Sequence, residues 1–358
     1  MSLSNAPAGR ARFAAIMATS LLLVSGAHAQ NAAIASPARP AVTAEIINAA
    51  PLDAASLSAA PVANIPIIAR GWAKPLKKPP IPNPSIVRLQ VLLDRAGASP
   101  GVIDGFNGDN VRKAILAFEI MQGLPADGQL DPEMLARIET PEPIVGVYTI
   151  SPEDVSAIVA PLPRDYAELA KRDFLGYTSV QEELAERFHM DQKFLITLNP
   201  GANFNAGDKV FVTAPGTKKK GVVATIQADK NLRQVRAYDA NGLLIAAYPA
   251  TIGSEDNPSP SGVHVVEGVA ANPTYTYNPK INFQQGKNTK VLTLPPGPNG
   301  PVGSTWIDLS EPTYGIHGTP EPSLIDKTGS HGCIRLTNWD AAELAGMVKP
   351  GVTVDFMS

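Results

Sequence analysis

The sequence predicts a multidomain α+β fold in which two small modules containing helices precede a mainly β domain. Apolar residues between 85 and 140, and again between 175 and 214, recur at the three- and four-residue spacing of helices. From Lys218 onward, apolar residues alternate with polar or smaller neighbours, as in half-buried strands. The 358 residues are enough for two or three domains.

The first 29 residues are typical of an export signal. Arg10 and Arg12 precede a short apolar run, Phe13 to Val24, and Ala27-His28-Ala29 has the pattern of a cleavage site. We expect cleavage after Ala29 and no stable membrane insertion afterwards, the alternative being a retained anchor. Cleavage would take the formal net charge from −3 to −5, and neither value provides a basic field for nucleic acid.

Residues 30 to 84 are predicted to be a disordered, Pro/Ala-rich tether. Ten of the 54 residues from 31 to 84 are proline, and no apolar period is sustained. Without such a period no core can offset the entropy lost on ordering. Proline also extends a chain, so this segment would let the folded part reach away from its N-terminus.

Residues 85 to 140 are predicted to form a bundle of three short helices. Ile86, Leu89 and Leu93 share one helical face, and Asp131-Pro132 supplies an N-cap and a first residue for the last helix. The region resembles the peptidoglycan-binding three-helix domain along the segment LQVLLDRAGASPGVIDGFNGDNVRKAILAFEIMQGLPADGQLD. Glu119 replaces the usual glutamine of that family. The resemblance implies binding to peptidoglycan, and the alternative is a helical spacer without a ligand.

Residues 141 to 172 are predicted to be a connector with one short helix, and residues 173 to 216 a βααβ module. Ser179 and Glu182 form a capping box at a helix start, and Val210 to Val212 has the pattern of a strand. The segment that begins YTSVQEELAERF resembles a LysM module, which implies binding to glycans that contain N-acetylglucosamine. The alternative is a diverged copy that packs against its neighbour and binds no sugar.

Residues 217 to 358 are predicted to form a mainly β domain. Asn241-Gly242 between two strand-like runs is a hairpin signal, and Thr305 to Leu309 is another strand. Only Asp340 to Val348 has a helical pattern. The long loops between 267 and 304 suggest a functional or mobile segment.

The chain contains one cysteine, Cys333. Exported proteins usually pair their cysteines, so a single one is an inert buried side chain, an intermolecular link or a reactive nucleophile. Two polar clusters, Tyr314 to Thr319 and Ser330 to Arg335, suggest the last of these. Only 12 residues separate His317 from Ser330, so we expect the intervening loop to return to its start.

A histidine beside a thiol can take its proton and leave a nucleophilic thiolate. Gly332 has no side chain to obstruct an acyl group, and consecutive N–H groups near Gly332 and Cys333 can hold an oxyanion. Two other interpretations remain open, a polar core and a zinc site. The zinc site would use His317, His331 and Cys333, with or without His264, although H-x-C fits no structural zinc pattern and no C-x-x-C accompanies it.

The C-terminal domain resembles the L,D-transpeptidase catalytic domain (YkuD family) most clearly in YGIHGTPEPSLIDKTGSHGCIRLTNWDAAEL. The family signature is an upstream H-G-T followed by S/T-H-G-C-x-R, and weaker matches extend over residues 218 to 356. Ser259 stands where the family prefers threonine. The loops ANPTYTYNP and LPPGPNGPVG are similar to those of envelope enzymes of diderm bacteria, which implies a periplasmic, wall-associated protein.

The resemblance implies roles for individual residues. Cys333 matches the nucleophile, His317 its base, and the carbonyl of Gly318 the group that orients this histidine. Arg335 matches the motif arginine and would either bind a substrate carboxylate or pair with an aspartate. The residues expected to support the active site and shape its oxyanion region are Ser330, His331 and Gly332.

The resemblance also implies a reaction that needs no metal or organic cofactor. Cys333 would attack a tetrapeptide stem of peptidoglycan at its third residue, release D-alanine and form a thioester. An amine of a second stem (a 3→3 crosslink) or of an envelope protein would accept the acyl group. With water as acceptor the same route gives an L,D-carboxypeptidase or endopeptidase. The alternatives from other classes are a non-catalytic wall-binding scaffold and a zinc-dependent hydrolase.

Overall fold

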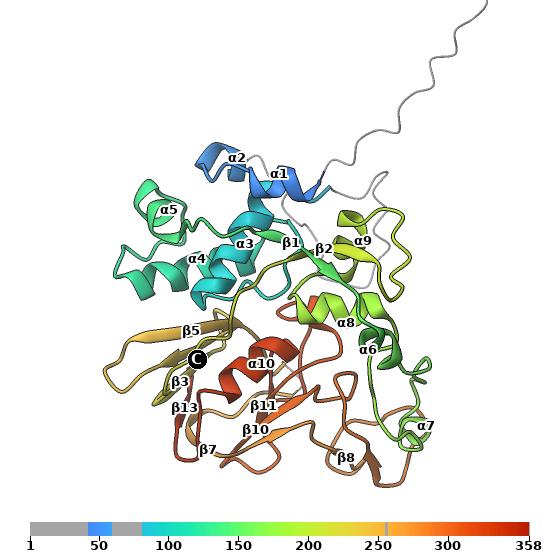
Figure 1. Cartoon of the computed structure of the whole chain (residues 1–358). Coiled ribbons are helices and arrows are strands. Elements are labelled where there is room, and N and C mark those ends of the chain that lie inside the picture. Colours follow the sequence, from blue (N-terminus) through green and yellow to red (C-terminus); the bar gives the residue numbers. More distant parts are fainter. Residues whose placement is uncertain (1–41, 59–80, 255–256, 358) are drawn as a thin grey trace, which may run out of the picture. The chain divides into compact units, whose positions relative to one another are not determined.

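The computed structural model describes residues 42–58, 81–254 and 257–357. The predicted export signal lies outside these ranges, as do residues 30–41 and 59–80 of the predicted tether. Within them, no helix is long and apolar enough to cross a membrane. A helical region comes first along the chain and a mainly β domain comes last (Figure 1).

Part of the predicted tether is folded. Residues 42–58 contain two short helices, α1 (Ala44–Asn48) and α2 (Ala54–Ser58). Ile47 and Leu57 are buried in the apolar core of the helices that follow, and the Asn48 side chain hydrogen-bonds both backbone groups of Val145. The prediction of disorder is therefore wrong for this stretch. Its apolar residues are too few to show a period, but the neighbouring bundle supplies the core that buries them.

Three helices follow where the sequence predicts them: α3 (Pro84–Ala96), α4 (Asp109–Gln122) and α5 (Pro132–Ile138). The Asp131 side chain caps α5 by accepting a hydrogen bond from the N–H of Met134. Glu119 turns into the bundle, where its Oε2 accepts a hydrogen bond of 2.7 Å from the N–H of Gly128. The residue that departs from the family's glutamine therefore fastens the turn after α4.

The next module is built from a longer piece of chain than the sequence predicts. Its two strands, β1 (Val145–Thr149) and β2 (Lys209–Thr213), pair antiparallel. Four helices lie between them: α6 (Pro152–Ser156), α7 (Tyr166–Leu169), α8 (Val180–Arg187) and α9 (Gln192–Leu198).

The first strand thus comes from the predicted connector, and residues 173–178 form no strand. Instead, the backbone of Leu175 pairs with the loop around Pro296 and Asn299 of the β domain. The module also shares one apolar cluster with the bundle, so these two regions have a common core rather than separate ones.

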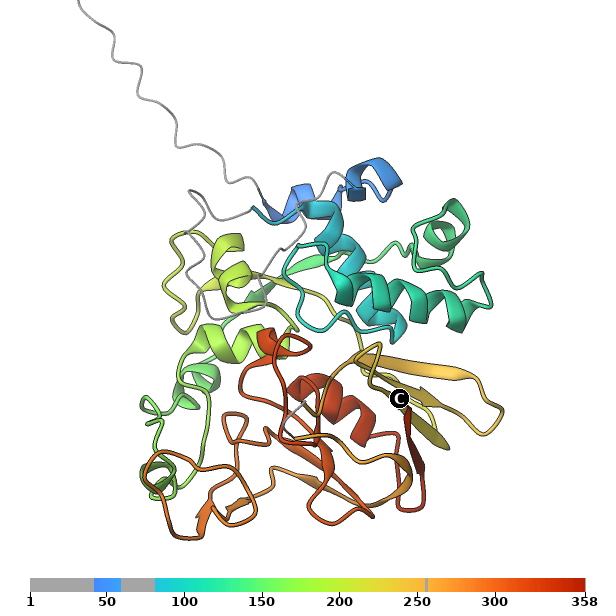
Figure 2. The same cartoon turned by 180° about the vertical axis from the view of Figure 1, so that it is seen from behind.

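A nine-stranded sheet forms the β domain, in the order β5-β4-β3-β13-β7-β10-β11-β12-β6. Figure 2 shows it from behind. The strands are β3 (Thr225–Asp229), β4 (Gln234–Tyr238), β5 (Leu244–Pro249), β6 (Thr251–Ile252), β7 (Gly262–Ala271), β10 (Thr305–Leu309), β11 (Gly315–His317), β12 (Ile334–Arg335) and β13 (Thr353–Met357). A separate hairpin consists of β8 (Tyr275–Tyr277) and β9 (Leu292–Leu294).

One helix, α10 (Asn338–Ala345), packs against β10, β11 and α8. It begins where the Thr337 side chain accepts a hydrogen bond from the N–H of Asp340. Buried residues of the sheet and of α10, among them Ile307, Ile316 and Leu344, form the core of the domain. The predicted hairpin at Asn241-Gly242 is confirmed, because it joins the antiparallel strands β4 and β5.

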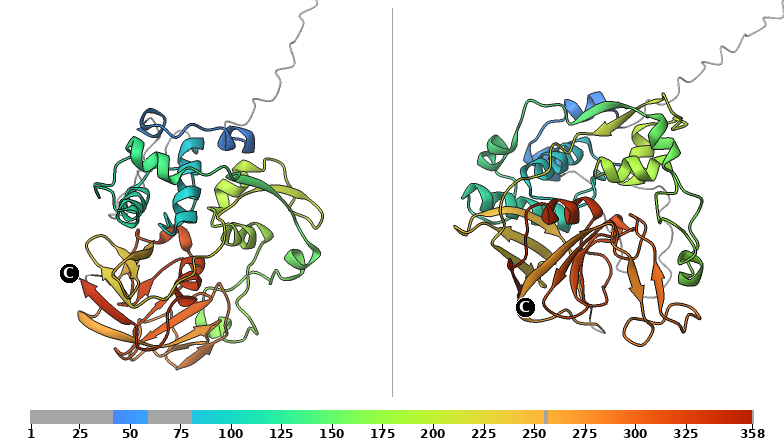
Figure 3. Two further views of the ribbon diagram at one scale, coloured as in Figure 1. Left: turned by 60° about the vertical axis from the view of Figure 1, so that its left-hand side comes forward. Right: turned by 60° about the horizontal axis from the view of Figure 1, so that its bottom comes forward.

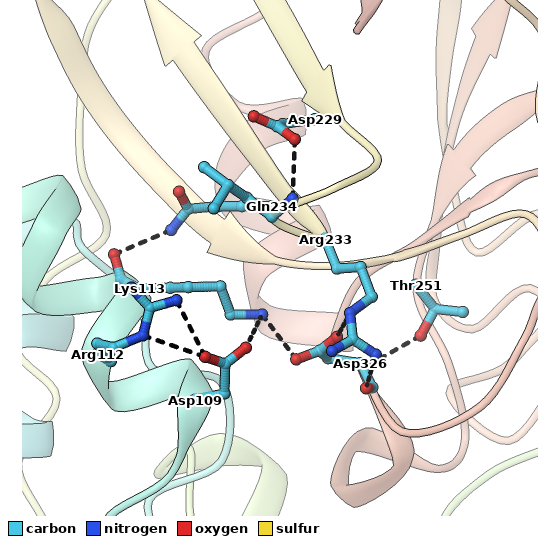
Figure 4. Close-up of polar contacts among 9 residues, drawn as sticks. Asp109, Arg112, Lys113, Asp229, Arg233, Gln234, Thr251 and Asp326 are labelled. Carbon is cyan, nitrogen blue, oxygen red and sulfur yellow. Dashed lines mark hydrogen bonds and ion pairs between the residues drawn. The ribbon is translucent and has the colours of Figure 1, made fainter. Parts of the chain in front are cut away.

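The bundle and the β domain are joined by a buried ion pair (Figure 4). Lys113 Nζ of α4 lies 2.6 Å from Asp326 Oδ2, in the loop between the two motifs, and both side chains are buried. Arg233 Nε lies 2.6 Å from the other carboxylate oxygen. Burial raises the pKa of Asp326, although Lys113 and then Arg233 oppose that shift. The active-site loop is thus held by a side chain of the helical bundle.

Candidate active site

The two polar motifs meet on adjacent strands. β11 and β12 run parallel, and their register pairs His317 with Arg335 and Ile316 with Ile334. Because paired residues of adjacent strands share a face, Arg335 lies on the same face as His317, and Cys333 directly precedes β12. The prediction that the loop from His317 to Ser330 returns to its start is confirmed.

A tight turn presents the cysteine. Ser330 is buried, and its Oγ donates a hydrogen bond of 2.6 Å to the carbonyl of Cys333, while its N–H donates to Gly253 at 3.0 Å. Gly332 has a φ of +104°, and a Cβ at this position would lie 2.5 Å from the ring of Tyr314. The turn therefore requires glycine immediately before the thiol.

The Cys333 thiol is partly buried and uncharged in its ordinary state. Its Sγ lies 3.7 Å from the carbonyl oxygen of Thr313 and makes no hydrogen bond to His317 among the described residues. Burial raises the pKa of the thiol, while the N–H of Gly315 and the charge of Arg335 oppose that rise. Burial therefore favours the protonated form of the thiol.

His317 is buried and held in one tautomer. Its Nδ1 lies 2.7 Å from the carbonyl oxygen of Gly318, which can only accept, so Nδ1 carries the proton and Nε2 is left as the base. Burial lowers the pKa of His317 to about 4, and the charge of Arg335 acts in the same direction. The imidazole is therefore neutral at physiological pH. Trp306 stacks on it with a centroid distance of 5.6 Å.

Arg335 is half-buried and forms no ion pair with any residue in the described ranges. Burial lowers the pKa of its guanidinium, and the charge of Glu321 opposes this. The structure therefore shows no pairing of Arg335 with any of the three aspartates predicted as possible partners, which are Asp308, Asp326 and Asp340.

Across the described residues, no group of three or more His, Cys, Asp or Glu side chains is arranged to hold a metal ion. His264, considered as a zinc ligand, lies on β7, where its ring packs against Phe356 and its Nε2 lies 3.2 Å from the carbonyl oxygen of Ser261. A zinc site made of the predicted residues is therefore not supported.

The sequence of the β domain matches known proteins. Residues 224–355 match the family model described as "L,D-transpeptidase catalytic domain". A curated relative from Bacillus licheniformis, "Putative L,D-transpeptidase YkuD", is 32% identical over 177 residues, which cover 48% of this chain and 90% of that protein. The chain belongs to the L,D-transpeptidase family. The resemblance of the C-terminal domain is thus confirmed.

A second curated relative has the same family description. "Probable L,D-transpeptidase ErfK/SrfK" of Escherichia coli is 28% identical over 220 residues, covering 56% of this chain and 68% of that protein. A crystal structure of L,D-transpeptidase 3 from Mycobacterium tuberculosis aligns with a TM-score of 0.31 and 15% identity, covering 42% of this chain and 68% of that one.

A second family model, "Putative peptidoglycan binding domain", matches residues 82–138. The predicted identity of the three-helix bundle is therefore confirmed, and this L,D-transpeptidase is a cell-wall-associated enzyme of the peptidoglycan. Neither model covers residues 173–216, so the LysM likeness of that module stays a prediction.

Beside the transpeptidase site lies an aromatic wall that the sequence analysis missed. Tyr166 of α7 packs edge-on against Tyr277 and Phe283, with centroid distances of 5.3 and 6.0 Å. Phe283 in turn stacks on His331, two residues before the cysteine, at 4.4 Å. Tyr166 escaped notice because it lies in the predicted connector, whereas the aromatic residues around 275–283 were visible as a cluster in the long loop.

Hydrogen bonds fasten this connector to the β8–β9 hairpin. The Gln285 side chain accepts from the N–H of Tyr166 at 3.1 Å and donates to the carbonyl of Arg164 at 2.8 Å. Asn288 Nδ2 lies 3.2 Å from Asp165. Figure 3 shows α7 beside the hairpin in its right-hand view. One wall of the site thus comes from outside the matched catalytic domain.

The structure also has a hollow of about 360 Å³. The residues that line it come from the connector, the module, the long loop and the active-site loop: Pro161, Leu162, Thr178, Asn299 and Pro320. Pro320, one of these lining residues, directly follows the H-G-T motif.

Proposed function

We propose that Cys333 and His317 transfer the acyl group of a peptidoglycan tetrapeptide stem to an amine. One observation carries this proposal. The strand that carries His317 pairs in parallel with the strand that directly follows Cys333, and His317 Nδ1 is committed to the Gly318 carbonyl, which leaves Nε2 as a neutral base. A thiol and such a base are the pair that nucleophilic acyl transfer requires.

The reaction begins with both groups neutral. As Sγ of Cys333 attacks the carbonyl carbon of the third stem residue, its proton passes to His317 Nε2. N–H groups of the turn at Gly332 and Cys333 hold the oxyanion that forms. When the intermediate collapses, the bond to D-alanine breaks, the leaving amine takes the proton from His317, and a thioester remains.

The acceptor then attacks the thioester. Its amine loses a proton to His317 as the new amide bond forms, and that proton returns to the departing sulfur of Cys333. An amine of a second stem gives a 3→3 crosslink, an amine of an envelope protein gives protein attachment, and water gives carboxypeptidase or endopeptidase activity. Membership of the transpeptidase family supports acyl transfer without distinguishing these acceptors, and the experiment below separates crosslinking from the other outcomes.

Supporting roles are assigned to the rest of the motif. Ser330 holds the cysteine turn closed through its bond to the Cys333 carbonyl. His331, exposed and stacked on Phe283, borders the oxyanion region. Arg335, which has no acidic partner among the described residues, is free to bind a carboxylate of the stem.

The bundle and the export signal define where the enzyme works. Binding of residues 82–138 to the wall would raise the concentration of stem peptides at Cys333. We propose a periplasmic location, with the signal of residues 1–29 removed. Binding of glycan by the LysM-like module is a separate proposal, tested by its retention on purified glycan strands.

The test is mass spectrometry of residues 30–358 mixed with a disaccharide-tetrapeptide, with Cys333→Ala alongside. We expect a thioester adduct on Cys333, release of D-alanine and a crosslinked dimer, and none of these with the variant. Release of D-alanine without a dimer assigns the chain to carboxypeptidation or to a protein acceptor. Absence of both adduct and release from the unchanged chain would overturn the proposal in favour of a wall-binding scaffold.

A further inference from the structure

We propose that Glu186 of the LysM-like module and Asn338 of α10 are positioning residues that hold the active-site base His317 in its working orientation. This inference rests on the proposed cysteine mechanism. It assigns the module a part in catalysis that is independent of any sugar binding. Glu186 lies outside the segment that matches the transpeptidase family, residues 224–355.

The first link is the side chain of Asn338, which is buried at the start of α10. Its Oδ1 accepts two backbone hydrogen bonds of 3.1 Å, one from Ser304 and one from Thr319 of the H-G-T motif. A single amide oxygen therefore fixes two backbone segments. One follows β11, and the other lies between the long loop and β10.

The second link is the close packing of this amide against Gly318. A Cβ at Gly318 would lie 2.1 Å from Asn338 Oδ1, and a Cβ at Gly303 would lie 2.0 Å from the same atom. Both positions therefore require glycine. Since the carbonyl of Gly318 receives the Nδ1 hydrogen of His317 at 2.7 Å, the position of Asn338 determines where that carbonyl points.

The third link is the carboxylate of Glu186, buried on α8. Asn338 Nδ2 donates to both of its oxygens, at 3.2 and 2.9 Å, and also to the carbonyl of Pro298 at 3.2 Å. An amide has one accepting end and one donating end. Because the oxygens of ionised Glu186 can only accept, this form favours the orientation in which Nδ2 faces Glu186 and Oδ1 faces Thr319.

Other groups around Glu186 tie it in place. The hydroxyl of Tyr177 donates to its Oε2 at 3.2 Å. Burial raises the pKa of Glu186 to about 7, while its bonds to Asn338 and Tyr177 oppose the rise; Glu182 raises the pKa further and His189 lowers it. Both oxygens of this buried side chain accept from Asn338 of the catalytic domain, and Oε2 also accepts from Tyr177, which indicates a positioning role rather than packing alone.

The test compares three variants of the exported chain: Glu186→Leu, Glu186→Gln and, as a matched control, Glu183→Leu. Glu183 is also buried on α8, but its partner is Arg187. We expect Glu186→Leu to lower kcat for D-alanine release on the order of 100-fold, with KM nearly unchanged, since the base and not the substrate is displaced. Glu186→Gln, whose amide oxygen still accepts from Asn338, should recover most of the rate.

A second readout does not depend on activity. In ¹⁵N-histidine NMR spectra of the unchanged chain, His317 should show the Nδ1-protonated tautomer. Glu186→Leu should weaken that signature and Glu183→Leu should keep it. If Glu186→Leu does not fold, Glu186→Asp replaces it, because the shorter side chain withdraws the carboxylate from Asn338 while keeping its charge.

The outcomes are distinguishable from failure of the proposed function. An unchanged chain without cysteine-dependent turnover would refute that function, whereas the His317 signature would still report on the contact. Wild-type kcat and an unaltered His317 signature in Glu186→Leu or Glu186→Asp would overturn the positioning role. An equal loss of kcat in Glu183→Leu would overturn it as well, because the effect would then come from the module's stability.

Discussion

Two buried carboxylates take part in contacts between the helical region and the catalytic domain, and their partners differ in charge. At one contact, Lys113 of α4 pairs with Asp326, a charged partner on the loop that leads to Cys333. At the other, Glu186 of α8 pairs with the neutral amide of Asn338, which bears on His317. The first contact, called the thiol side below, holds the loop that leads to Cys333. The second, called the base side, holds the backbone that follows His317.

The difference in charge between the two partners predicts how each contact should affect the enzyme. An ion pair buried between two domains is strongly destabilising to break, because the remaining charge stays buried. An amide that accepts two backbone hydrogen bonds instead fixes geometry over a fraction of an ångström. We therefore expect the Lys113 contact to govern stability and the Glu186 contact to govern turnover.

The largest effect is expected at the base itself. His317→Gln removes the group that accepts the thiol proton, so kcat should fall on the order of 10²- to 10⁴-fold. D-alanine release from the tetrapeptide measures it. This value sets the upper limit for the loss in Glu186→Leu, since a positioning residue acts only through His317. Full activity in His317→Gln would assign the base to His331 or to solvent.

Breaking the contact on the thiol side should mainly cost stability. Lys113→Met leaves Asp326 with Arg233 as its partner, so the free energy of unfolding should fall by up to about 3–5 kcal/mol. Urea denaturation measures it, with Asp326→Asn and the double variant completing a mutant cycle. We expect kcat of the folded fraction to change by less than in Glu186→Leu. If Lys113→Met leaves the free energy of unfolding unchanged but abolishes turnover, the assignment of this contact to stability is wrong.

The pH dependence sharpens the description of the base side. Burial holds the pKa of His317 near 4, below the ordinary value of 6.5. Its neutral form is therefore favoured by folding, and the associated stability is present above pH 6.5 and lost as the pH falls toward 4. The profile of kcat/KM should be flat through pH 6.5 and fall about tenfold per unit below pH 4. An inflection of kcat/KM at pH 6.5 that arises from titration of His317 would contradict this.

The smallest effect is expected at the aromatic wall, a third contact from outside the catalytic domain. Tyr166→Ala removes the ring that packs on Tyr277 and Phe283, so KM for the stem should rise about 2- to 10-fold, the equivalent of aromatic contacts worth about 0.5–1.5 kcal/mol each. Tyr166→Phe keeps the ring and should keep KM. Equal effects of both variants would assign the role to the hydroxyl instead.

Local signals in the sequence predicted the family motifs and most of the regular elements. These features depend on local signals, which can be recognised in the sequence alone. They are the motifs around His317 and Cys333, the hairpin at Asn241-Gly242, the strand Thr305 to Leu309 and the three helices of the bundle. Capping residues, turn glycines and apolar periods act over a few neighbouring positions.

The tertiary structure decided which segments join. β1 lies in the predicted connector, residues 42–58 fold onto the bundle, and Lys113, Tyr166 and Glu186 all contact residues more than 100 positions away in the chain. A buried lysine or glutamate has no distinctive local pattern, and its role depends on the partner that the fold supplies. Such contacts arise only when separate elements pack together, so the residues that orient the active site could not be found from sequence spacing.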